Sequence, residues 1–575
     1  MKLSRLHFLF LGFIAFAVVL VGRLFSLQVS DYGTFAAFAR GQQYVFADLT
    51  PERGAILGRN RSGEESVFAT MQDLPLVYAV PRDIADHEAT MTLLRDVLML
   101  SEADAAELSE RLARGDDPYE PIAERLSEGM AARIREAALP GVHVSVARAR
   151  VYPQASRLAH VLGFVGFDAN GEKRGVYGIE AWYEAILRGS PGKLRGERDG
   201  EGRVLEAFSQ STASPVPGAD IVLTIDPHIQ YRAEKALQEA AEKFKVTGGS
   251  AIVVEVKTGA VVALASVPTF DPNNYGSVKD VDNYTNDAVS IPYEPGSIFK
   301  PITMAAALDT GAVTPETTFE NTGRVSLNGY TISNVLTQYD GRLMTMIDVL
   351  RNSLNTGAIF AMQQAGQDRF LKYLEAFGFG SVTGIELPGE STGSIANLYT
   401  GREINFATAS FGQGVTATPL QMTMAVGAIA NGGTLMQPHV VSEIRNPDGT
   451  VETFPPASVR EVISSKTARQ LAAMMVRVVD DGSGYATKIP GYSIAGKTGT
   501  AQIPKVGSSG YESSHIHSFV GFFPAFDAQY VLLTKLDRPQ GARYAEVSAV
   551  PMARDIIEYL ITYAGIPPDR PLSEN

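Results

Sequence analysis

The sequence of 575 residues contains no cysteine. Disulfide bonds, a catalytic thiolate and cysteine-ligated zinc are therefore excluded, and the composition suits a compartment where stray thiols would be oxidised. The eight histidines form no His-x-x-x-His pair, so no metal site is expected. Basic residues do not predominate, and the net charge of −13 argues against a nucleic-acid partner.

Only one stretch is hydrophobic enough to enter a membrane, and it lies at the N-terminus. Residues 8–22 carry no charge, Arg23 interrupts them, and residues 24–29 are mostly apolar. A span needs about 20 residues, so Arg23 has to extend its charged end toward the interface. A cleaved signal peptide is the alternative, but no clear small-x-small cleavage site follows. Because Lys2 and Arg5 precede the span, we expect an uncleaved signal anchor over residues 1–29, with the tail cytoplasmic and the body extracytoplasmic.

The rest of the chain divides by composition into a pedestal and a compact domain. Residues 30–220 are of mixed charge and hold no catalytic constellation, and the Pro- and Ser-rich residues 209–218 are predicted to be a linker. Residues 221–566 predict an α/β (α+β layered) domain, in which helices cover one mostly antiparallel sheet of sequence-distant strands, and residues 567–575 form a tail. The predicted elements are a hairpin (250–256 and 260–266), helices (302–308, 344–350, 358–364 and 553–563) and strands (493–503 and 519–536).

The first candidate for chemistry is the segment from Tyr293 to Pro301, which contains Ser297 and Lys300. On a helix that begins near Gly296, these two side chains share one face. A serine hydroxyl becomes a nucleophile when a neighbouring base takes its proton, and a lysine kept neutral by burial can be that base. The pair alone is weak evidence, since Ser190 and Lys193 have the same spacing.

Two further motifs follow the first, and each also has a chance copy. Ser353-Leu354-Asn355 is repeated at residues 326–328, where Asn-Gly predicts a hairpin turn, and Ser-x-Asn recurs at residues 573–575. Lys497-Thr498-Gly499-Thr500 shares its first three residues with residues 257–259, at the tip of the predicted hairpin. Helix capping is the simpler interpretation of Ser353 and Asn355 considered alone. The ordered trio is what chance does not readily produce.

This trio resembles that of the serine penicillin-recognising enzymes. Other segments are similar to the class B penicillin-binding proteins specifically, including pedestal motifs over nearly the whole chain. They are residues 51–60, 150–153, 159–160, 178–180, 293–297, 411–414 and 418–421. Two departures stand out: Gly58 replaces the usual Asp, and Asn286-Asp287-Ala288 replaces the usual Asn-Arg-Ala. Both lie outside the trio, so they put local packing in question more than chemistry.

The resemblance implies a peptidoglycan D,D-transpeptidase that works through an acyl-serine intermediate and needs no cofactor. Ser297 would attack the donor peptide, Lys300 would act as base, and Ser353 would relay a proton to the departing D-Ala. Asn355 would hold the substrate amide and orient Lys300, and Lys497 would keep Lys300 neutral by its charge.

The third motif would bind the substrate's terminal carboxylate through the charge of Lys497 and the hydroxyls of Thr498 and Thr500. Gly499, with Gly496, would leave room for a peptide along the strand. The backbone N–H groups of Ser297 and Thr500 would form the oxyanion hole.

The resemblance also predicts subtype and partners. Residues 517–524 and 536–539 look most like the division-associated branch, which implies septal synthesis with a SEDS-family glycosyltransferase and other division proteins. No Glu between Asn355 and Lys497 has an Asn four residues later, so the water-positioning motif of one β-lactamase class is missing and β-lactams should trap the enzyme. A carboxypeptidase, a β-lactamase, a membrane-tethered penicillin sensor and an inactive division protein are the alternatives.

Overall fold

The computed structural model describes residues 5–30, 44–168, 171–198, 204–505, 507–508 and 510–571. The chain forms two compact units, one of residues 1–53 and 188–218 and one of residues 54–187 and 219–575. The Ser-x-Asn copy at 573–575 and part of the predicted tail lie outside the described residues.

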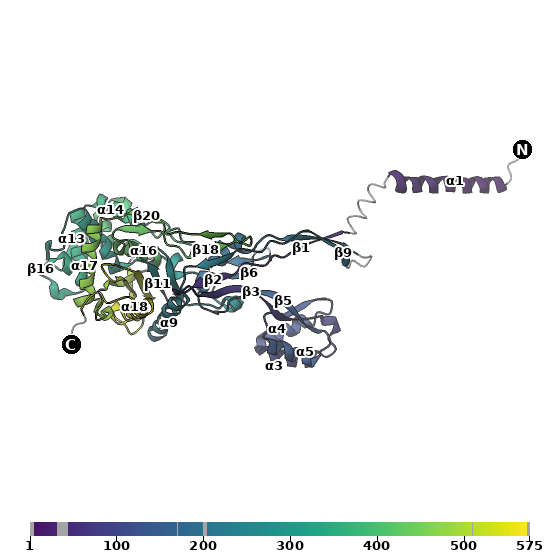
Figure 1. Ribbon diagram of the computed structural model, residues 1–575, viewed down its shortest axis with the longest axis horizontal. Coiled ribbons are helices and arrows are strands. Elements are labelled where there is room, and N and C mark those ends of the chain that lie inside the picture. The colour runs from purple at the N-terminus through teal and green to yellow at the C-terminus, as the bar shows by residue number, and fades with distance from the viewer. Residues whose placement is uncertain are drawn as a thin grey trace. The chain divides into compact units, whose positions relative to one another are not determined.

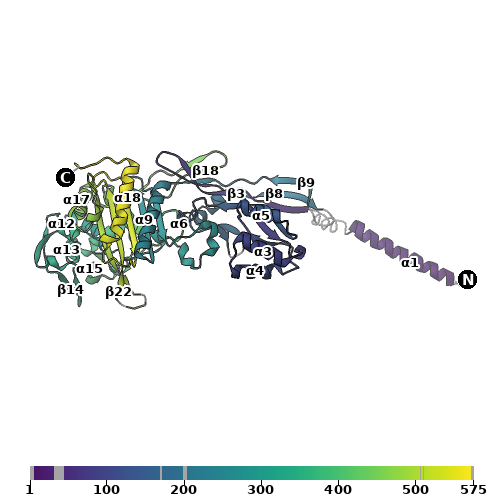
Figure 2. The same cartoon turned by 90° about the horizontal axis from the view of Figure 1, so that it is seen from below.

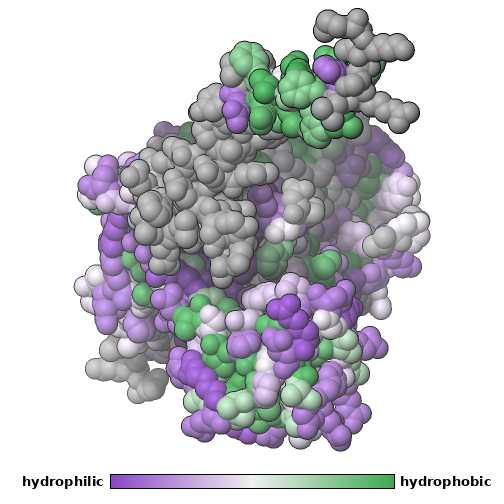
Figure 3. Space-filling model, turned by 90° about the vertical axis from the view of Figure 1, so that its right-hand side faces the viewer, coloured by the Kyte–Doolittle hydropathy of each residue, from purple (hydrophilic) through white to green (hydrophobic). Residues whose placement is uncertain are grey.

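The first unit contains the predicted membrane segment. Helix α1 (Arg5–Phe25) continues into a π-helical turn, and residues His7–Gln28 are long and apolar enough to cross a membrane. None of the described side chains of this span is buried, and its hydrophobic surface is visible at the top of Figure 3. The unit also contains a three-stranded sheet in the order β1-β8-β9, with β1 at Tyr44–Leu49, β8 at Gly192–Arg198 and β9 at Val204–Ala213. The predicted linker at 209–218 therefore begins inside a strand.

Ser190 and Lys193, which repeat the Ser-Lys spacing by chance, lie in the same unit, which contains none of the three motifs. Ser190 makes a β-bridge with Val216, and Lys193 is part of β8, paired opposite Asp48 of β1. A strand sends residues three apart to opposite faces, so helical spacing in the sequence has no meaning here.

The second unit begins with a seven-stranded sheet in the order β19-β18-β10-β2-β3-β4, in which β5 also pairs with β3. Three helices with acidic first turns and serine or aspartate N-caps pack beside β3 and β5 around a small apolar core of their own (Figure 1). The strands are β2 (Ile56–Arg59), β3 (Glu65–Ala79), β4 (Glu120–Ala123), β5 (Val142–Val151), β10 (Asp220–Leu223), β18 (Val441–Arg445) and β19 (Val451–Thr453). The helices are α3 (His87–Leu98), α4 (Glu102–Leu112) and α5 (Glu128–Ala137).

The family-like pedestal motifs meet in a buried polar cluster. The Arg150 guanidinium donates to Glu180 Oε1 at 2.7 Å and to the Gly54 carbonyl at 2.7 Å, and the Tyr152 hydroxyl donates to Glu180 at 3.2 Å. Arg150 and Glu180 are almost completely buried, so each charge depends on the other.

The departure at Gly58 has a packing explanation. A Cβ atom at this position would lie 2.1 Å from the ring of Phe68, which is itself buried. Aspartate therefore does not fit beside this phenylalanine without a shift of the ring.

The main domain is built on a five-stranded antiparallel sheet in the order β12-β11-β23-β22-β21. Alternate residues of each strand face two apolar cores: Ala251 and Val253 contact the core under α9 and α18, and Ile252 and Val254 contact the core under the central helices. Figure 2 shows α9 and α18 together on one face of the sheet. The strands are β11 (Gly248–Glu255), β12 (Val261–Val267), β21 (Ala495–Pro504), β22 (Tyr511–Phe523) and β23 (Tyr530–Asp537).

The central helices and small sheets complete the domain. The longer helices are α9 (Pro227–Phe244), α11 (Lys300–Asp309), α13 (Asn355–Ala365), α14 (Gln367–Ala376), α16 (Pro419–Ala430), α17 (Ser465–Asp481) and α18 (Ala549–Ala564). The shorter helices are α6 (Ala159–Leu162), α7 (Gly178–Trp182), α8 (Glu184–Leu187), α10 (Asp287–Ser290), α12 (Met346–Arg351) and α15 (Glu403–Ala409). The paired small strands are β6 (Phe164–Phe167) with β7 (Lys173–Val176), β13 (Thr318–Asn321) with β16 (Arg342–Thr345), β14 (Arg324–Leu327) with β15 (Tyr330–Ser333), and β17 (Thr434–Met436) with β20 (Ser458–Glu461).

The layered fold is confirmed, and so are the hairpin β11–β12, the strands near the third motif and the closing helix. Several boundaries differ. The helix predicted over 344–350 begins only at Met346, because Thr345 ends β16 and caps α12 with its hydroxyl. The strand segment predicted over 519–536 is divided between the end of β22 and β23, and the closing helix begins at Ala549. The predicted domain boundary at 220–221 falls inside β10, which pairs with β2 on one side and β18 on the other. The domain limits stay a prediction.

Candidate active site

The segment of Ser297 enters the core as a tight turn. Gly296–Phe299 form one 3-10 turn that runs directly into α11, so Ser297 and Lys300, three residues apart, lie one above the other. Gly296 has φ +59° and packs against Ala501, where an added Cβ would lie 2.9 Å from the Cβ of Ala501. Only glycine accepts both this backbone and this contact.

Lys300 contacts three oxygen atoms of the first two motifs. Its Nζ lies 3.1 Å from Ser297 Oγ, 2.6 Å from the Ser353 carbonyl and 3.0 Å from Ser353 Oγ. A neutral amine has two N–H donors, which suit the two Ser353 oxygens, and one lone pair, which can accept the Ser297 proton. Burial lowers the pKa of Lys300 well below its usual value, and the nearby charge of Lys497 lowers it further.

Ser353 lies in the loop between α12 and α13, with the left-handed backbone angle φ +56°. Such a conformation is strained for a non-glycine residue and turns both Ser353 oxygens toward Lys300. The Asn355 side chain donates from Nδ2 to the Ser333 carbonyl at 3.0 Å, while Lys300 bonds to Ser297 and Ser353. The expected role of Asn355 in orienting Lys300 therefore stays a prediction.

The third motif lies on β21, the edge strand of the sheet. Lys497 is completely buried, and its Nζ donates to the Thr498 carbonyl at 3.1 Å. Burial lowers the pKa of Lys497 to about 8, against the opposing effect of the Glu546 carboxylate. Sequence reasoning missed Glu546, since no local motif marks it.

The hydroxyls expected to bind a carboxylate are already positioned by neighbours. Thr498 Oγ1 is 2.7 Å from Ser483 Oγ, and the Ala545 N–H donates to Thr500 Oγ1 at 3.2 Å. Ser483 and Ala545 are further residues that sequence reasoning missed.

The reason for glycine in the third motif differs from the prediction. A Cβ at Gly499 would lie 2.5 Å from Ser518 Oγ and 3.0 Å from Ile298, and one at Gly496 would lie 2.4 Å from the Phe519 ring. Protein atoms, rather than space for a substrate, occupy these positions. The glycines let β21 pack closely on its own domain.

An open cleft of about 750 Å³ joins the three motifs. Its lining includes Ser297, Ser353, Asn355, Thr498 and Thr500. The trio that the sequence places far apart thus shares one cavity, and the lysines lie buried behind it.

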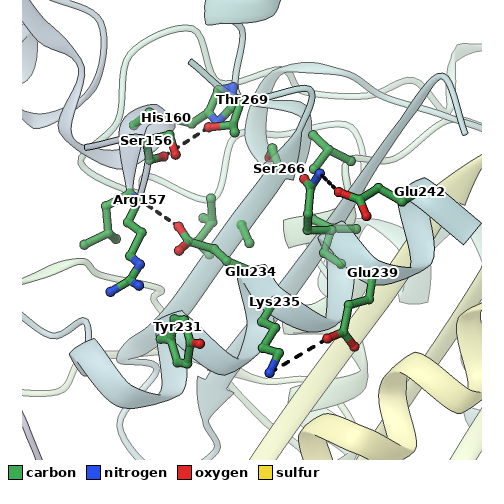
Figure 4. A pocket seen from close by; sticks show the side chains of 17 residues that line it. Ser156, Arg157, His160, Tyr231, Glu234, Lys235, Glu239, Glu242, Ser266 and Thr269 are labelled. Atoms are coloured by element: carbon green, nitrogen blue, oxygen red, sulfur yellow. Dashed lines mark hydrogen bonds and ion pairs between the residues drawn. The ribbon is translucent and has the colours of Figure 1, made fainter. Parts of the chain in front are cut away.

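A second cavity, of about 540 Å³, borders the opposite edge strand β12 and contains none of the trio (Figure 4). In it, Glu234 accepts hydrogen bonds from the Leu158 N–H and from Gln230, both at 2.8 Å, and Lys235 faces Glu239. Residues of the three motifs thus line the cleft at β21 and not this cavity.

Comparison with known proteins agrees with this fold and site. Residues 249–558 match the penicillin binding protein transpeptidase domain, and residues 48–223 match the penicillin-binding protein dimerisation domain. Together the fold and the cleft define a serine acyltransferase of the penicillin-recognising type. The chain belongs to the penicillin-binding proteins that join a dimerisation domain to a transpeptidase domain.

Individual relatives cover nearly the full length. Stage V sporulation protein D of Bacillus subtilis is 35% identical over 522 residues, which cover 90% of this chain and 79% of that protein. The probable peptidoglycan D,D-transpeptidase PbpC of Pseudomonas aeruginosa is 29% identical, covering 97% and 94%. The structure of penicillin binding protein 3 from Mycobacterium tuberculosis with aztreonam has a TM-score of 0.70 and 27% identity, covering 92% of this chain and 99% of that one.

Proposed function

We propose that this protein is a peptidoglycan D,D-transpeptidase that β-lactams inactivate covalently. The observation that carries the proposal is the contact of one buried lysine, Lys300, with the hydroxyls of both Ser297 and Ser353 at the floor of the cleft.

In the first half-reaction, Ser297 Oγ attacks the carbonyl of the penultimate D-Ala, and its proton passes to the neutral amine of Lys300. The C–O bond forms, the peptide C–N bond breaks, and the departing D-Ala nitrogen receives a proton through Ser353. The lysine is suited to this because it is buried and its pKa is lowered. Backbone N–H groups of Ser297 and Thr500 stabilise the developing oxyanion, each worth about 3 kcal/mol of barrier.

In the second half-reaction, an amine of another stem peptide attacks the acyl-serine. Lys300 accepts the amine proton, and the departing Ser297 oxygen receives a proton in return. The new amide links two peptides and frees Ser297. The third motif holds the donor through its terminal carboxylate, with Lys497 supplying charge and Thr498 and Thr500 supplying hydroxyls. Asn355 holds the substrate amide.

The site of action follows from the N-terminal helix. A single apolar helix supports a one-pass anchor with its tail in the cytoplasm and the catalytic body on the periplasmic side. A septal role, together with a SEDS-family glycosyltransferase and other division proteins, is the finer part of the proposal. It rests on the division-type segments of the sequence and on the name of a relative, a peptidoglycan D,D-transpeptidase FtsI homolog of Mesostigma viride.

The test has two parts. The purified chain should be labelled by a fluorescent penicillin, and Ser297→Ala should remove the label; a labelled variant would refute the nucleophile. Incubation with a partner polymerase and lipid-linked precursor, followed by muropeptide analysis, should give cross-linked dimers that penicillin suppresses. Trimmed monomers would instead identify a D,D-carboxypeptidase.

A further inference from the structure

Asp287 replaces the arginine that the family resemblance leads one to expect, and it faces a lysine on the sheet. Lys535 Nζ donates to both carboxylate oxygens of Asp287, at 2.9 and 3.1 Å, and to Asp537 Oδ2 at 2.7 Å. Lys535 is almost completely buried, with 1% of its surface exposed. One cation thus serves two carboxylates inside the domain.

The position of this cation explains why arginine is absent from position 287. An arginine there would place a second buried positive charge against Lys535, with only Asp537 to balance the two. In this chain the positive charge lies on strand β23, and the residue opposite it on α10 is acidic.

We propose that Lys535 is a positioning residue for the acylation of Ser297. Its ammonium holds the segment 287–297 against the sheet, in the role that an arginine at position 287 would otherwise have. This inference rests on the proposed acyl transfer at Ser297.

Two contacts connect Lys535 to the nucleophile. Asp287 begins the segment, and the ring of Tyr293, four residues before Ser297, lies over Lys535 with its centroid 5.3 Å from Nζ. Tyr293 is buried and exchanges backbone hydrogen bonds with Ala417 at 3.0 Å in both directions. The ammonium therefore contacts the segment at two points, the first residue of α10 and Tyr293, which follows that helix.

A polar row across the sheet leads from Lys535 to the third motif. The strand register aligns Ser250, Lys535, Ser518 and Gly499 on neighbouring strands, so they face the same side. Ser518 Oγ lies where a side chain of Gly499 would be, next to Ile298 behind the nucleophile. Lys535 thus lies on the same face of the sheet as Gly499 of the third motif, two strands away.

The raised pKa of Lys535 keeps its side chain charged, as a permanent ion pair requires. Burial lowers the pKa of Lys535, but the carboxylates of Asp287 and Asp537 outweigh this effect and raise it overall. Removing the ammonium leaves the carboxylates of Asp287 and Asp537 next to each other without the cation that both contact, and their repulsion acts to separate α10 from β23.

The experiment is a double-mutant cycle on the full-length chain in detergent, which moves the buried positive charge from position 535 to position 287. Lys535→Met, Asp287→Arg and the double variant are compared by their penicillin acylation kinetics, with the covalent rate constant separated from the non-covalent binding constant. Each single variant should lower the covalent rate constant about tenfold or more, since small displacements of a nucleophile are this costly. The double variant, which returns one cation to the cluster, should recover to within about threefold of the unaltered chain.

The control is Arg554→Met, which removes an exposed ion pair with Glu558 and should change neither constant. A double variant no faster than the slower single variant overturns the proposal, and so do single variants that acylate normally. If a single variant does not fold, recovery of folded, acylating protein in the double variant is itself the expected rescue. Absence of acylation in the unaltered chain would refute the proposed function, whereas acylation insensitive to these changes refutes only the positioning.

Discussion

Lys497→Met should make the protein more stable at neutral pH and yet less reactive. Lys497 is completely buried, and its hydrogen bond to the Thr498 carbonyl is long, at 3.1 Å. Methionine has nearly the same length and carries no charge, so it removes the cost of a buried ammonium without leaving a large cavity.

The size of the effect follows from the lowered pKa. The pKa of Lys497 falls from 10.5 to about 8 on folding. At about 1.4 kcal/mol per pKa unit, this difference destabilises the fold by about 3 kcal/mol at pH 7. The lost hydrogen bond opposes the gain by about 1 kcal/mol. We therefore expect Lys497→Met to be about 2 kcal/mol more stable at pH 7.

Because folding lowers the pKa of Lys497, the destabilisation depends on pH. Below pH 8 the lysine is charged in both states, and the fold carries the full penalty. Between pH 8 and 10.5 the folded chain releases the proton while the unfolded chain keeps it, so the penalty falls as the pH rises. The stability advantage of Lys497→Met should therefore shrink steadily over this range.

The assay is urea denaturation of the full-length chain in detergent, followed by circular dichroism at pH 7, 8, 9 and 10. Groups far from Lys497 titrate alike in both proteins and cancel in the difference, whereas Lys300 does not, because the charge of Lys497 lowers its pKa. Penicillin acylation should fall by about 10- to 100-fold, the value of a charge-assisted contact to a carboxylate. The control is Lys257→Met, the same change in the exposed copy of the triplet, which should alter neither quantity. A variant less stable at pH 7, or a difference independent of pH, would refute the reasoning.

Two further predictions concern the base and the pedestal. Lys300→Met should stay folded and lose at least about 100-fold in the rate of fluorescent penicillin labelling, because among the described residues Lys300 is the basic side chain in hydrogen-bond contact with Ser297 Oγ; labelling within tenfold of normal would contradict this role. Gly58→Asp should lower the thermal midpoint, with overpacking against Phe68 worth about 1–3 kcal/mol, while labelling is unchanged. Gly115→Asp, where no atom lies within 4 Å of a new Cβ, is the control; equal effects would contradict the packing account.

Features set by residues close together in the chain were predictable from the sequence, and features set by distant residues were not. The pairing of Ser297 with Lys300 was predictable, because three residues of a helical turn bring side chains together wherever the turn lies. The hairpin at 250–266 and the turn at Asn328-Gly329 were equally local, set by β-branched residues and by backbone angles that Asn and Gly accept.

The resemblance to a family, rather than any local rule, distinguished the true motifs from their copies. Lys257 and Lys497 begin the same triplet, but Lys257 is exposed in a turn and Lys497 is buried on an edge strand. Atoms contributed by distant segments bury Lys497 and so lower its pKa to about 8.

What the sequence by itself determined is the set of local geometries: an apolar anchor, a serine one turn from a lysine, and strands that alternate between two cores. Only the tertiary structure decided that Ser353 bonds to Lys300, that Gly58 lies against Phe68, and that Lys535 neutralises Asp287. Such contacts depend on the packing of the whole domain, since burial and electrostatic energy are set by neighbours that a short stretch of sequence does not contain.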